Sequence, residues 1–239
     1  MERALGVLLR EPVRLTGAGR TDAGVHALYC VAHFDASRDD LHADKLLISK
    51  INAITPNEIA VDRIVSVPPD AHARFDAISR TYHYLIAPKK NPFTFDFAYH
   101  FYRPLNVAKM NEAAAILLEY SDFTSFGKLH GNNKTNICNV FNAQWLEDLN
   151  GDLRFVITAN RFLRNMVRAI VGTMIEIGLG KYSPVDIRRI IIEKDREAAG
   201  TSAPPHGLYL AKIEYPKNLF VKTWHATSLQ SAGRDGGLA

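Results

Sequence analysis

The stretch that decides how this chain folds is Gly17-Ala18-Gly19-Arg20-Thr21-Asp22-Ala23-Gly24-Val25-His26-Ala27. Its glycines permit backbone angles that side chains normally exclude, so the segment can turn sharply and approach a large ligand closely. The apolar run Val25–Phe34 that follows is typical of a β-strand. A carboxylate held beside a rigid strand is placed as a nucleophile or general base would be. Read by itself, the pattern favours an aspartate that caps a turn, and the rest of the chain decides otherwise.

Other segments complete a pattern that runs through nearly the whole chain. They are, in order, Arg80–Tyr84 (RTYHY), Asp122–Phe126 (DFTSF), Asn160–Arg168 (NRFLRNMVR, continuing to Gly172) and Gly207–Leu210 (GLYL). Together with residues 17–27 they resemble the TruA-type tRNA pseudouridine synthases, from about Leu5 to Pro216. Eleven consecutive matching positions at 17–27, followed by the other motifs in the expected order, make chance agreement remote.

The resemblance implies an isomerase that converts uridine to pseudouridine in the tRNA anticodon stem-loop. That reaction breaks the C1′–N1 glycosidic bond, rotates the base and rejoins it through C5, after the base has been drawn out of its stack. The product is an isomer of the substrate, so we expect no metal, redox cofactor or cosubstrate. By resemblance Asp22 is the carboxylate nucleophile, and the sequence leaves open whether it attacks the sugar or the base. The resemblance also implies a homodimer, with one tRNA contacting both subunits.

Arg168 has support that does not depend on the resemblance. We predict a helix over residues 161–177, in which Arg161, Arg164 and Arg168 share one polar stripe. The other positions are mostly apolar, so Arg168 is a cation on an otherwise buried helix, where a charge is normally paired. We expect an internal ion pair between Arg168 and Asp22. The alternative is a surface arginine whose charge reaches solvent, and it suits Arg161 and in part Arg164 better.

Tyr82 lies in an alternating strand and matches the active-site tyrosine of the family. A phenol at that place can stack on the flipped base and bring its oxygen near C5 as the proton acceptor. The neighbouring Tyr84 is better explained by packing within the strand. Arginines in or beside the motifs suit a phosphate-lined cleft, and we expect RNA contacts from Arg20, Arg80, Arg161 and Arg164.

The composition is that of a globular protein in a reducing compartment. The chain has 239 residues, 47% of them apolar, which is enough for a sizeable core. Its net charge of +4 is compatible with a polyanionic partner and is weak support alone. Cys30 and Cys138 lie in apolar or strand-like runs, and we expect buried, unpaired thiols. The nine histidines show no metal-ligand spacing. Neither a membrane span nor a signal peptide is evident, so we expect a cytoplasmic protein.

Periodicity and turn signals predict a mixture of helices and strands. Helices are expected at residues 1–9, 44–52, 106–120 and 161–177, and another begins at Ser183. Strands are expected at residues 25–34, 59–67, 81–87, 98–102, 140–146, 153–160 and 208–215, with Asn150-Gly151 as a hairpin turn. These elements indicate an α+β fold with a mixed, largely antiparallel sheet. The resemblance implies that two halves share this sheet, with flanking helices and a central RNA-binding cleft.

We expect the halves to be residues 1–104, with the nucleophile loop, and residues 105–216, which complete the cleft. Residues 217–239 form a tail whose last part has the composition of a disordered segment. Family members usually begin with a strand carrying Tyr-Asp-Gly and Gly-Trp-Gln elements, which this sequence lacks. Two hypotheses follow: an active synthase, or a truncated, catalytically impaired RNA-binding protein or tRNA chaperone with the same fold. A nucleotide-dependent enzyme is disfavoured, because the Gly17-x-Gly19 loop leads into a strand rather than a helix.

Overall fold

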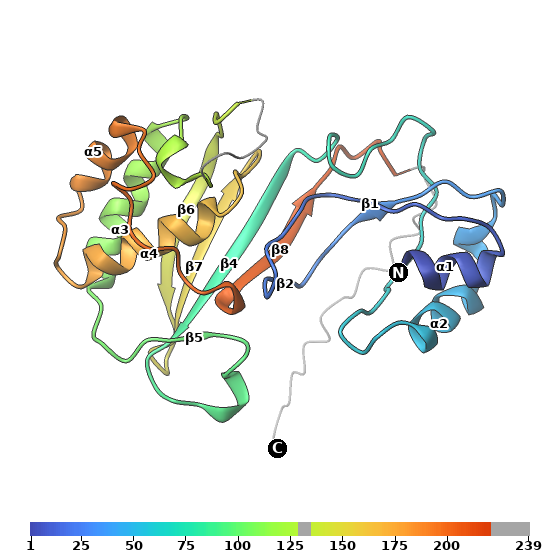
Figure 1. The fold of residues 1–239 in the computed structure, drawn as a ribbon, viewed down its shortest axis with the longest axis horizontal. Coiled ribbons are helices and arrows are strands. Elements are labelled where there is room, and N and C mark those ends of the chain that lie inside the picture. Colours follow the sequence, from blue (N-terminus) through green and yellow to red (C-terminus); the bar gives the residue numbers. More distant parts are fainter. Residues whose placement is uncertain (129–134, 221–239) are drawn as a thin grey trace, which may run out of the picture.

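The sheet at the centre of the fold is built from segments far apart in the sequence (Figure 1). The computed structural model describes residues 1–128 and 135–220. Within these residues the sheet has the order β2 (His26–Ala27), β8 (Leu208–Glu214), β4 (Ser79–Ala87), β7 (Leu153–Ala159) and β6 (Val140–Glu147), with β5 (Tyr99–His100) paired to β4. The β2–β8 and β4–β5 pairs are parallel and the others antiparallel. The prediction of an α+β fold with a mixed, largely antiparallel sheet is confirmed.

Strand β4 runs through the middle of the sheet and carries Tyr82. It pairs with β7 on one side and β8 on the other, so that Tyr82 lies opposite Ile157 and Leu210. The β4–β8 register shifts between Thr81 and Tyr82. Such irregularities re-aim the side chains next to them and are common beside active sites. Because Leu210 also pairs with Ala27 of β2, the shift lies where the sheet meets the glycine-rich loop.

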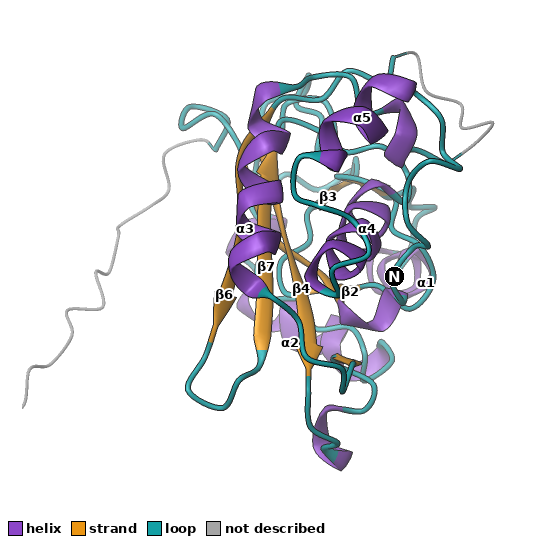
Figure 2. Ribbon diagram, turned by 90° about the vertical axis from the view of Figure 1, so that its left-hand side faces the viewer, coloured by secondary structure: helices purple, strands orange, loops and turns teal. Residues whose placement is uncertain are grey.

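Helices α3 (Val107–Ile116), α4 (Met166–Gly178) and α5 (Asp186–Glu193) lie on one side of the sheet (Figure 2). The main core lies between these helices and strands β4, β6 and β7, where Tyr84, Phe155 and Met174 are completely buried. In β7 every second residue is buried, as expected for a strand with one face against a core. The opposite face of the sheet carries none of these three helices.

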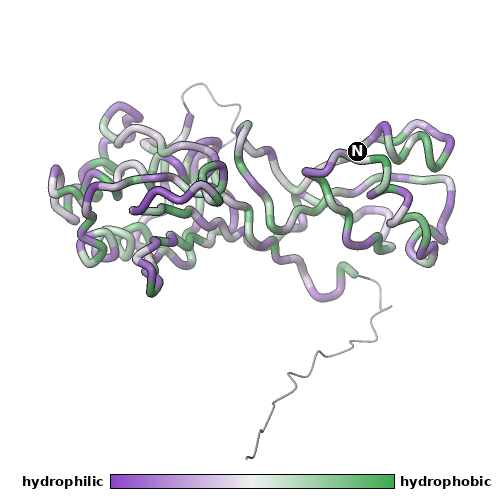
Figure 3. Tube along the Cα trace, turned by 90° about the horizontal axis from the view of Figure 1, so that it is seen from below, coloured by the Kyte–Doolittle hydropathy of each residue, from purple (hydrophilic) through white to green (hydrophobic). Residues whose placement is uncertain are grey.

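The remaining elements form a second, smaller lobe. Helices α1 (Glu2–Leu9) and α2 (Lys45–Ile54) pack together there, near a two-stranded sheet of β1 (Thr16–Gly17) and β3 (Ala32–His33). Leu5, Leu47 and Ile51 are the most buried apolar side chains of this lobe. Figures 1 and 3 show the two lobes side by side, and in Figure 1 strands β8 and β2 form the side of the main sheet that is nearest the smaller lobe. The glycine-rich loop connects β1 to β2 and so lies at their junction.

Several local signals predict element boundaries correctly. Asp44 caps α2, where its side chain accepts from the amides of Leu46 and Leu47, and Asn106 caps α3, where its side chain accepts from the amide of Lys109. Gly151 has φ 83° in the loop between β6 and β7, where the hairpin signal lies. The helix expected to begin at Ser183 begins three residues later, at Asp186, where the amide and the hydroxyl of Ser183 each donate to Asp186 Oδ2 at 2.7 Å. The boundaries that were predicted correctly depend on neighbours along the chain, which a sequence displays directly.

Other predicted elements were wrong. Residues 25–34 form two short strands, because β2 pairs with β8 whereas β3 pairs with β1 of the small sheet. Residues 59–67 are irregular. Cys30 is exposed rather than buried, while Cys138 is buried as predicted. The helix expected over residues 106–120 ends at Ile116, and a tighter 3₁₀ turn at residues 117–119 follows it, which leaves Leu118 45% exposed.

The helix predicted over residues 161–177 begins later, with Met166 as its first residue. Asn165 has φ 69°, a left-handed conformation that interrupts a right-handed helix. Residues 161–164 therefore approach α4 outside the helix, and the polar stripe predicted across residues 161–168 does not form. The disorder predicted for the last part of the tail, residues 231–239, lies outside the described residues.

Candidate active site

Asp22 lies in the glycine-rich loop where the two lobes meet. The backbone around it is held by the Ala18 amide, which donates to Val31 O at 2.8 Å, and by a turn in which Val25 N donates to Asp22 O at 3.2 Å. Gly24 has φ 81° in this turn, and a Cβ there would come within 3.2 Å of a proline side chain. The turn therefore requires glycine, and the loop that carries the carboxylate has a fixed shape.

Two arginines hold the Asp22 carboxylate, one on each oxygen. Arg168 Nη1 donates to Oδ2 at 2.9 Å, and Arg164 Nε donates to Oδ1 at 3.2 Å. The side chains of Arg168 and Asp22 are only 18% and 20% exposed, whereas that of Arg164 is 63% exposed. Water and salt screen the Arg164 contact more strongly, so the Arg168 contact is the stronger of the two.

Arg168 lies in the first turn of α4 and is itself held in place. Its Nε donates to the Ala203 carbonyl at 2.7 Å, and the Ala203 amide donates back to the Arg168 carbonyl at 2.9 Å. The segment with Ala203 runs so close to α4 that a Cβ on Gly172 would lie 1.7 Å from the Thr201 carbonyl oxygen. Glycine at position 172 therefore lets this segment reach Arg168, and the guanidinium approaches Asp22 in a fixed orientation.

Tyr82 packs edge-on against Phe162, with ring centroids 5.1 Å apart and planes at 86°. No residue in the described part of the chain hydrogen-bonds the Tyr82 hydroxyl. Burial raises the pKa of Tyr82 to about 12; the Arg80 charge opposes this shift, and the Asp22 charge adds to it. The phenol is therefore neutral at pH 7. Phe162 was not among the predicted site residues, although its place in the Asn160–Arg168 motif was a signal.

The arginines predicted to contact RNA have different surroundings. Arg20 is exposed two residues before Asp22, and Arg161 is partly buried in the approach to α4. Arg164 lies on Asp22. Arg80 is partly buried, and its guanidinium donates to backbone carbonyls of the protein itself. The structure thus brings Arg164 and Arg168 to the loop that carries Asp22, whereas the guanidinium of Arg80 binds carbonyl groups within the protein.

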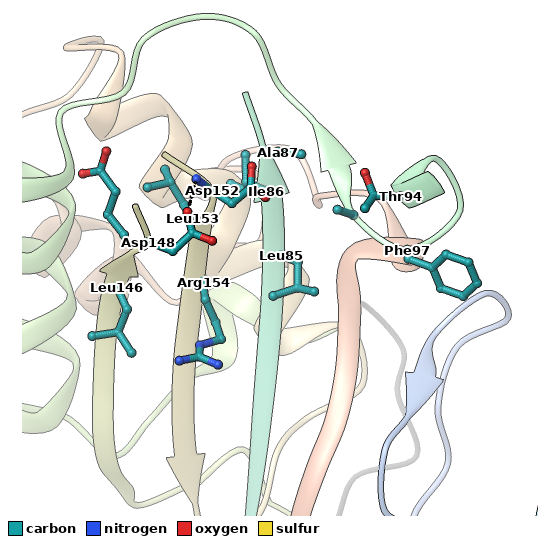
Figure 4. A pocket seen from close by; sticks show the side chains of 12 residues that line it. Leu85, Ile86, Ala87, Thr94, Phe97, Leu146, Asp148, Asp152, Leu153 and Arg154 are labelled. Carbon is teal, nitrogen blue, oxygen red and sulfur yellow. Dashed lines mark hydrogen bonds between the residues drawn. The ribbon is translucent and has the colours of Figure 1, made fainter. Parts of the chain in front are cut away.

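A cavity of about 330 Å³ lies elsewhere on the sheet (Figure 4). Leu85 and Arg154 line it from the neighbouring strands β4 and β7, and Asp148 and Asp152 line it from the β6–β7 hairpin. Leu85 is three residues from Tyr82 on β4, so the two side chains point to opposite faces of the sheet. The carboxylates of the cavity would repel a phosphate. It is not part of the candidate site.

Within residues 1–128 and 135–220, no group of three or more His, Cys, Asp or Glu side chains has the arrangement of a metal site. None of the helices in those two ranges combines the length and the apolar character that crossing a membrane needs.

Comparisons with known proteins put this chain in the class of the tRNA pseudouridine synthases. The family described as tRNA pseudouridine synthase matches residues 113–216. The tRNA pseudouridine synthase A of Bacteroides fragilis is 51% identical over 218 residues, which cover 91% of this chain and 86% of the relative. That of Porphyromonas gingivalis is 50% identical over 222 residues (92% and 88%). That of Bacillus subtilis is 40% identical over 219 residues (90% and 87%). The chain belongs to the tRNA pseudouridine synthase A family.

Proposed function

We propose that this protein isomerises uridine to pseudouridine in the anticodon stem-loop of tRNA, with Asp22 as the nucleophile. The observation that carries the proposal is the Asp22 carboxylate, sheltered on a shaped loop and bound by Arg168 and Arg164. The relatives named tRNA pseudouridine synthase A support the reaction and tRNA as the substrate. The choice of the anticodon stem-loop rests on the resemblance of the motifs.

The two arginines suggest how the nucleophile is released. A carboxylate with both oxygens hydrogen-bonded is a poor nucleophile, so one contact must open. Arg164 has the longer contact and the exposed side chain, so a polyanion can draw it away. We infer that Arg164 turns to a phosphate of the bound tRNA and frees Oδ1 of Asp22, while Arg168 keeps Oδ2 oriented. Attack on the sugar and attack on the base both need that free oxygen.

Tyr82 is proposed to stack on the extracted base and to take the proton from C5. It would act as the phenolate, which the raised pKa makes rare at pH 7 and strongly basic where it forms. Arg20 and Arg161 are proposed to bind phosphates around the cleft, because both are cations in the motifs that flank Asp22. A homodimer is proposed from the resemblance alone, whereas a cytoplasmic location and a division into halves near residue 104 are proposed from the sequence patterns.

Tritium release from tRNA labelled at C5 of uridine tests the proposal, because rejoining the base through C5 expels that hydrogen. We expect the wild-type protein to release tritium. Asp22→Asn, nearly the same shape without a carboxylate, is expected to release none and to bind tRNA within a few fold, since phosphate contacts dominate affinity. Replacing the uridines of the anticodon stem-loop by cytidine should abolish release. A wild-type protein that binds tRNA without release would instead be the impaired RNA-binding protein or tRNA chaperone.

A further inference from the structure

We propose that Arg80 is a positioning residue that locks the nucleophile loop against the segment carrying Arg164. The inference rests on the proposed function and departs from the expectation that Arg80 contacts RNA. Its basis is the set of partners that the Arg80 side chain has inside the protein.

The Arg80 guanidinium has no terminal N–H left for a phosphate. Nη1 donates to the carbonyl oxygens of Ala77 at 3.0 Å and Asn160 at 2.9 Å. Nη2 donates to those of Ala18 at 3.3 Å and Arg74 at 2.5 Å. Each terminal nitrogen carries two hydrogens, so all of them are used. The forked contact that arginines make with phosphate would have to break these bonds.

The carbonyls that Arg80 binds belong to the segments that carry the site. Ala18 lies four residues before Asp22, and Asn160 lies four residues before Arg164. Arg80 itself precedes Tyr82 by two residues on β4. One guanidinium therefore connects the backbones that carry the nucleophile, its exposed arginine partner and the tyrosine. Such support is what holds reacting groups at fixed separations.

The charge of Arg80 also acts on the site. Burial lowers the pKa of Arg80, and no carboxylate in the described part of the chain offsets that burial. Burying part of a cation without an anionic partner costs folding free energy. A neutral donor would avoid this cost, so we expect a role for the Arg80 charge as well as for its hydrogen bonds. The same charge lowers the pKa of Tyr82 against the effect of burial. It therefore favours the phenolate that the proposed proton transfer needs.

The variant Arg80→Lys separates positioning from RNA binding. Lysine keeps the charge but has three donors on one nitrogen and cannot span carbonyls of separate segments. We expect kcat for tritium release to fall about 10²-fold, as for a displaced catalytic group. The tRNA Kd should change by less than about threefold, since no phosphate contact is lost. Arg154→Lys, an exposed arginine on β7 of the same sheet, is the matched control and should change neither quantity.

A second variant gives a measurement that loss of shape alone would not move. Arg80→Gln removes the charge, so the limb of the pH–rate profile that reports Tyr82 should move to higher pH. In Arg80→Lys that limb should stay in place. A raised tRNA Kd with unchanged kcat in Arg80→Lys would make Arg80 a phosphate ligand and overturn the proposal. Unchanged kcat and Kd would overturn it as well.

The wild-type protein provides a test that does not depend on whether the variants fold. In protein labelled with ¹⁵N-arginine, the Nη–H signals of Arg80 should exchange slowly and should not shift when tRNA binds. Signals that shift with tRNA would overturn the proposal. Failure of the proposed function can be distinguished from failure of the Arg80 proposal, because in the first case the wild-type protein itself releases no tritium. An active wild type with a fully active Arg80→Lys variant refutes only the role of Arg80.

Discussion

Removing Arg168 should damage this protein more than removing Arg164, although both side chains bind Asp22. Arg168→Met keeps an apolar stem and deletes the donors to Asp22 Oδ2 and to the Ala203 carbonyl. Breaking a fully buried pair costs about 3–5 kcal/mol, and a hydrogen bond to a charged group contributes roughly 1.5–3 kcal/mol. The Arg168 and Asp22 side chains are each about one-fifth exposed, and in the variant Asp22 still binds Arg164, so the range for a hydrogen bond to a charged group applies. We expect the free energy of unfolding to fall by about 1.5–3 kcal/mol.

Arg164→Met is the matched comparison. Its side chain is 63% exposed, so the free energy of unfolding should fall by less than about 1 kcal/mol. Arg168→Met should lower kcat by about 10²-fold or more, because Asp22 loses its orientation. Arg164→Met should instead raise the tRNA Kd and reduce its salt dependence, since it removes a proposed phosphate contact. Urea unfolding, tritium release and tRNA binding at several salt concentrations measure these effects.

A double-mutant cycle decides whether Arg168 acts through Asp22. The double variant Asp22→Asn with Arg168→Met should be less destabilised than the sum of the single variants, by roughly 0.5–3 kcal/mol. Strictly additive free energies would mean that the pair contributes nothing to stability. Equal losses of kcat in Arg164→Met and Arg168→Met would refute the assignment of Arg168 as the lasting partner of Asp22.

Two further predictions concern the base and the backbone of the site. Tyr82→Phe keeps stacking and the Phe162 contact, and turnover should fall by roughly two to four orders of magnitude with tRNA affinity little changed. The phenolate fraction of Tyr82 grows tenfold per pH unit below its pKa of about 12, so the wild-type rate of tritium release should rise with pH, whereas the rate of Tyr82→Phe should show no such rise. A near wild-type rate in Tyr82→Phe would mean that Tyr82 contributes stacking alone. Gly172→Ala should destabilise the fold by about 1–3 kcal/mol and lower kcat, since its Cβ would overlap the Thr201 carbonyl and displace Ala203. Gly178→Ala meets only the flexible Met110 and Leu105 side chains, so equal losses in urea unfolding would contradict this account.

The elements that could be predicted from the sequence are those with local causes. The β6–β7 hairpin follows from alternating residues around a glycine that adopts φ 83°. Helix α2 follows from its apolar periodicity, and helix α3 follows from its capping residue Asn106, whose side chain accepts from the Lys109 amide three residues away. Each signal is complete within one turn or one strand, so no knowledge of the tertiary structure is needed.

The elements that could not be predicted have distant causes. The split of residues 25–34 follows from pairing with β8, whose residues Tyr209 and Leu210 lie far along the chain. The late start of α4 follows from Asn165, which is left-handed and whose Nδ2 donates to Ser202 Oγ at 2.6 Å. The helical periodicity of the sequence continues through Asn165. Nothing in residues 161–168 indicates that the Asn165 side chain binds Ser202, which lies far along the chain.

Sequence patterns could not predict the roles of the individual arginines, because these roles also depend on contacts with distant segments. Arg80, Arg164 and Arg168 lie in motifs and carry the same charge, but the protein uses different numbers of their donors. Arg80 has both terminal nitrogens on carbonyls, Arg168 uses Nε and Nη1, and Arg164 uses Nε alone. The donors left for RNA therefore increase from Arg80 to Arg168 to Arg164. We expect their contributions to tRNA affinity in that order and their contributions to the shape of the site in the reverse order, because a donor bound to the protein cannot also bind a phosphate.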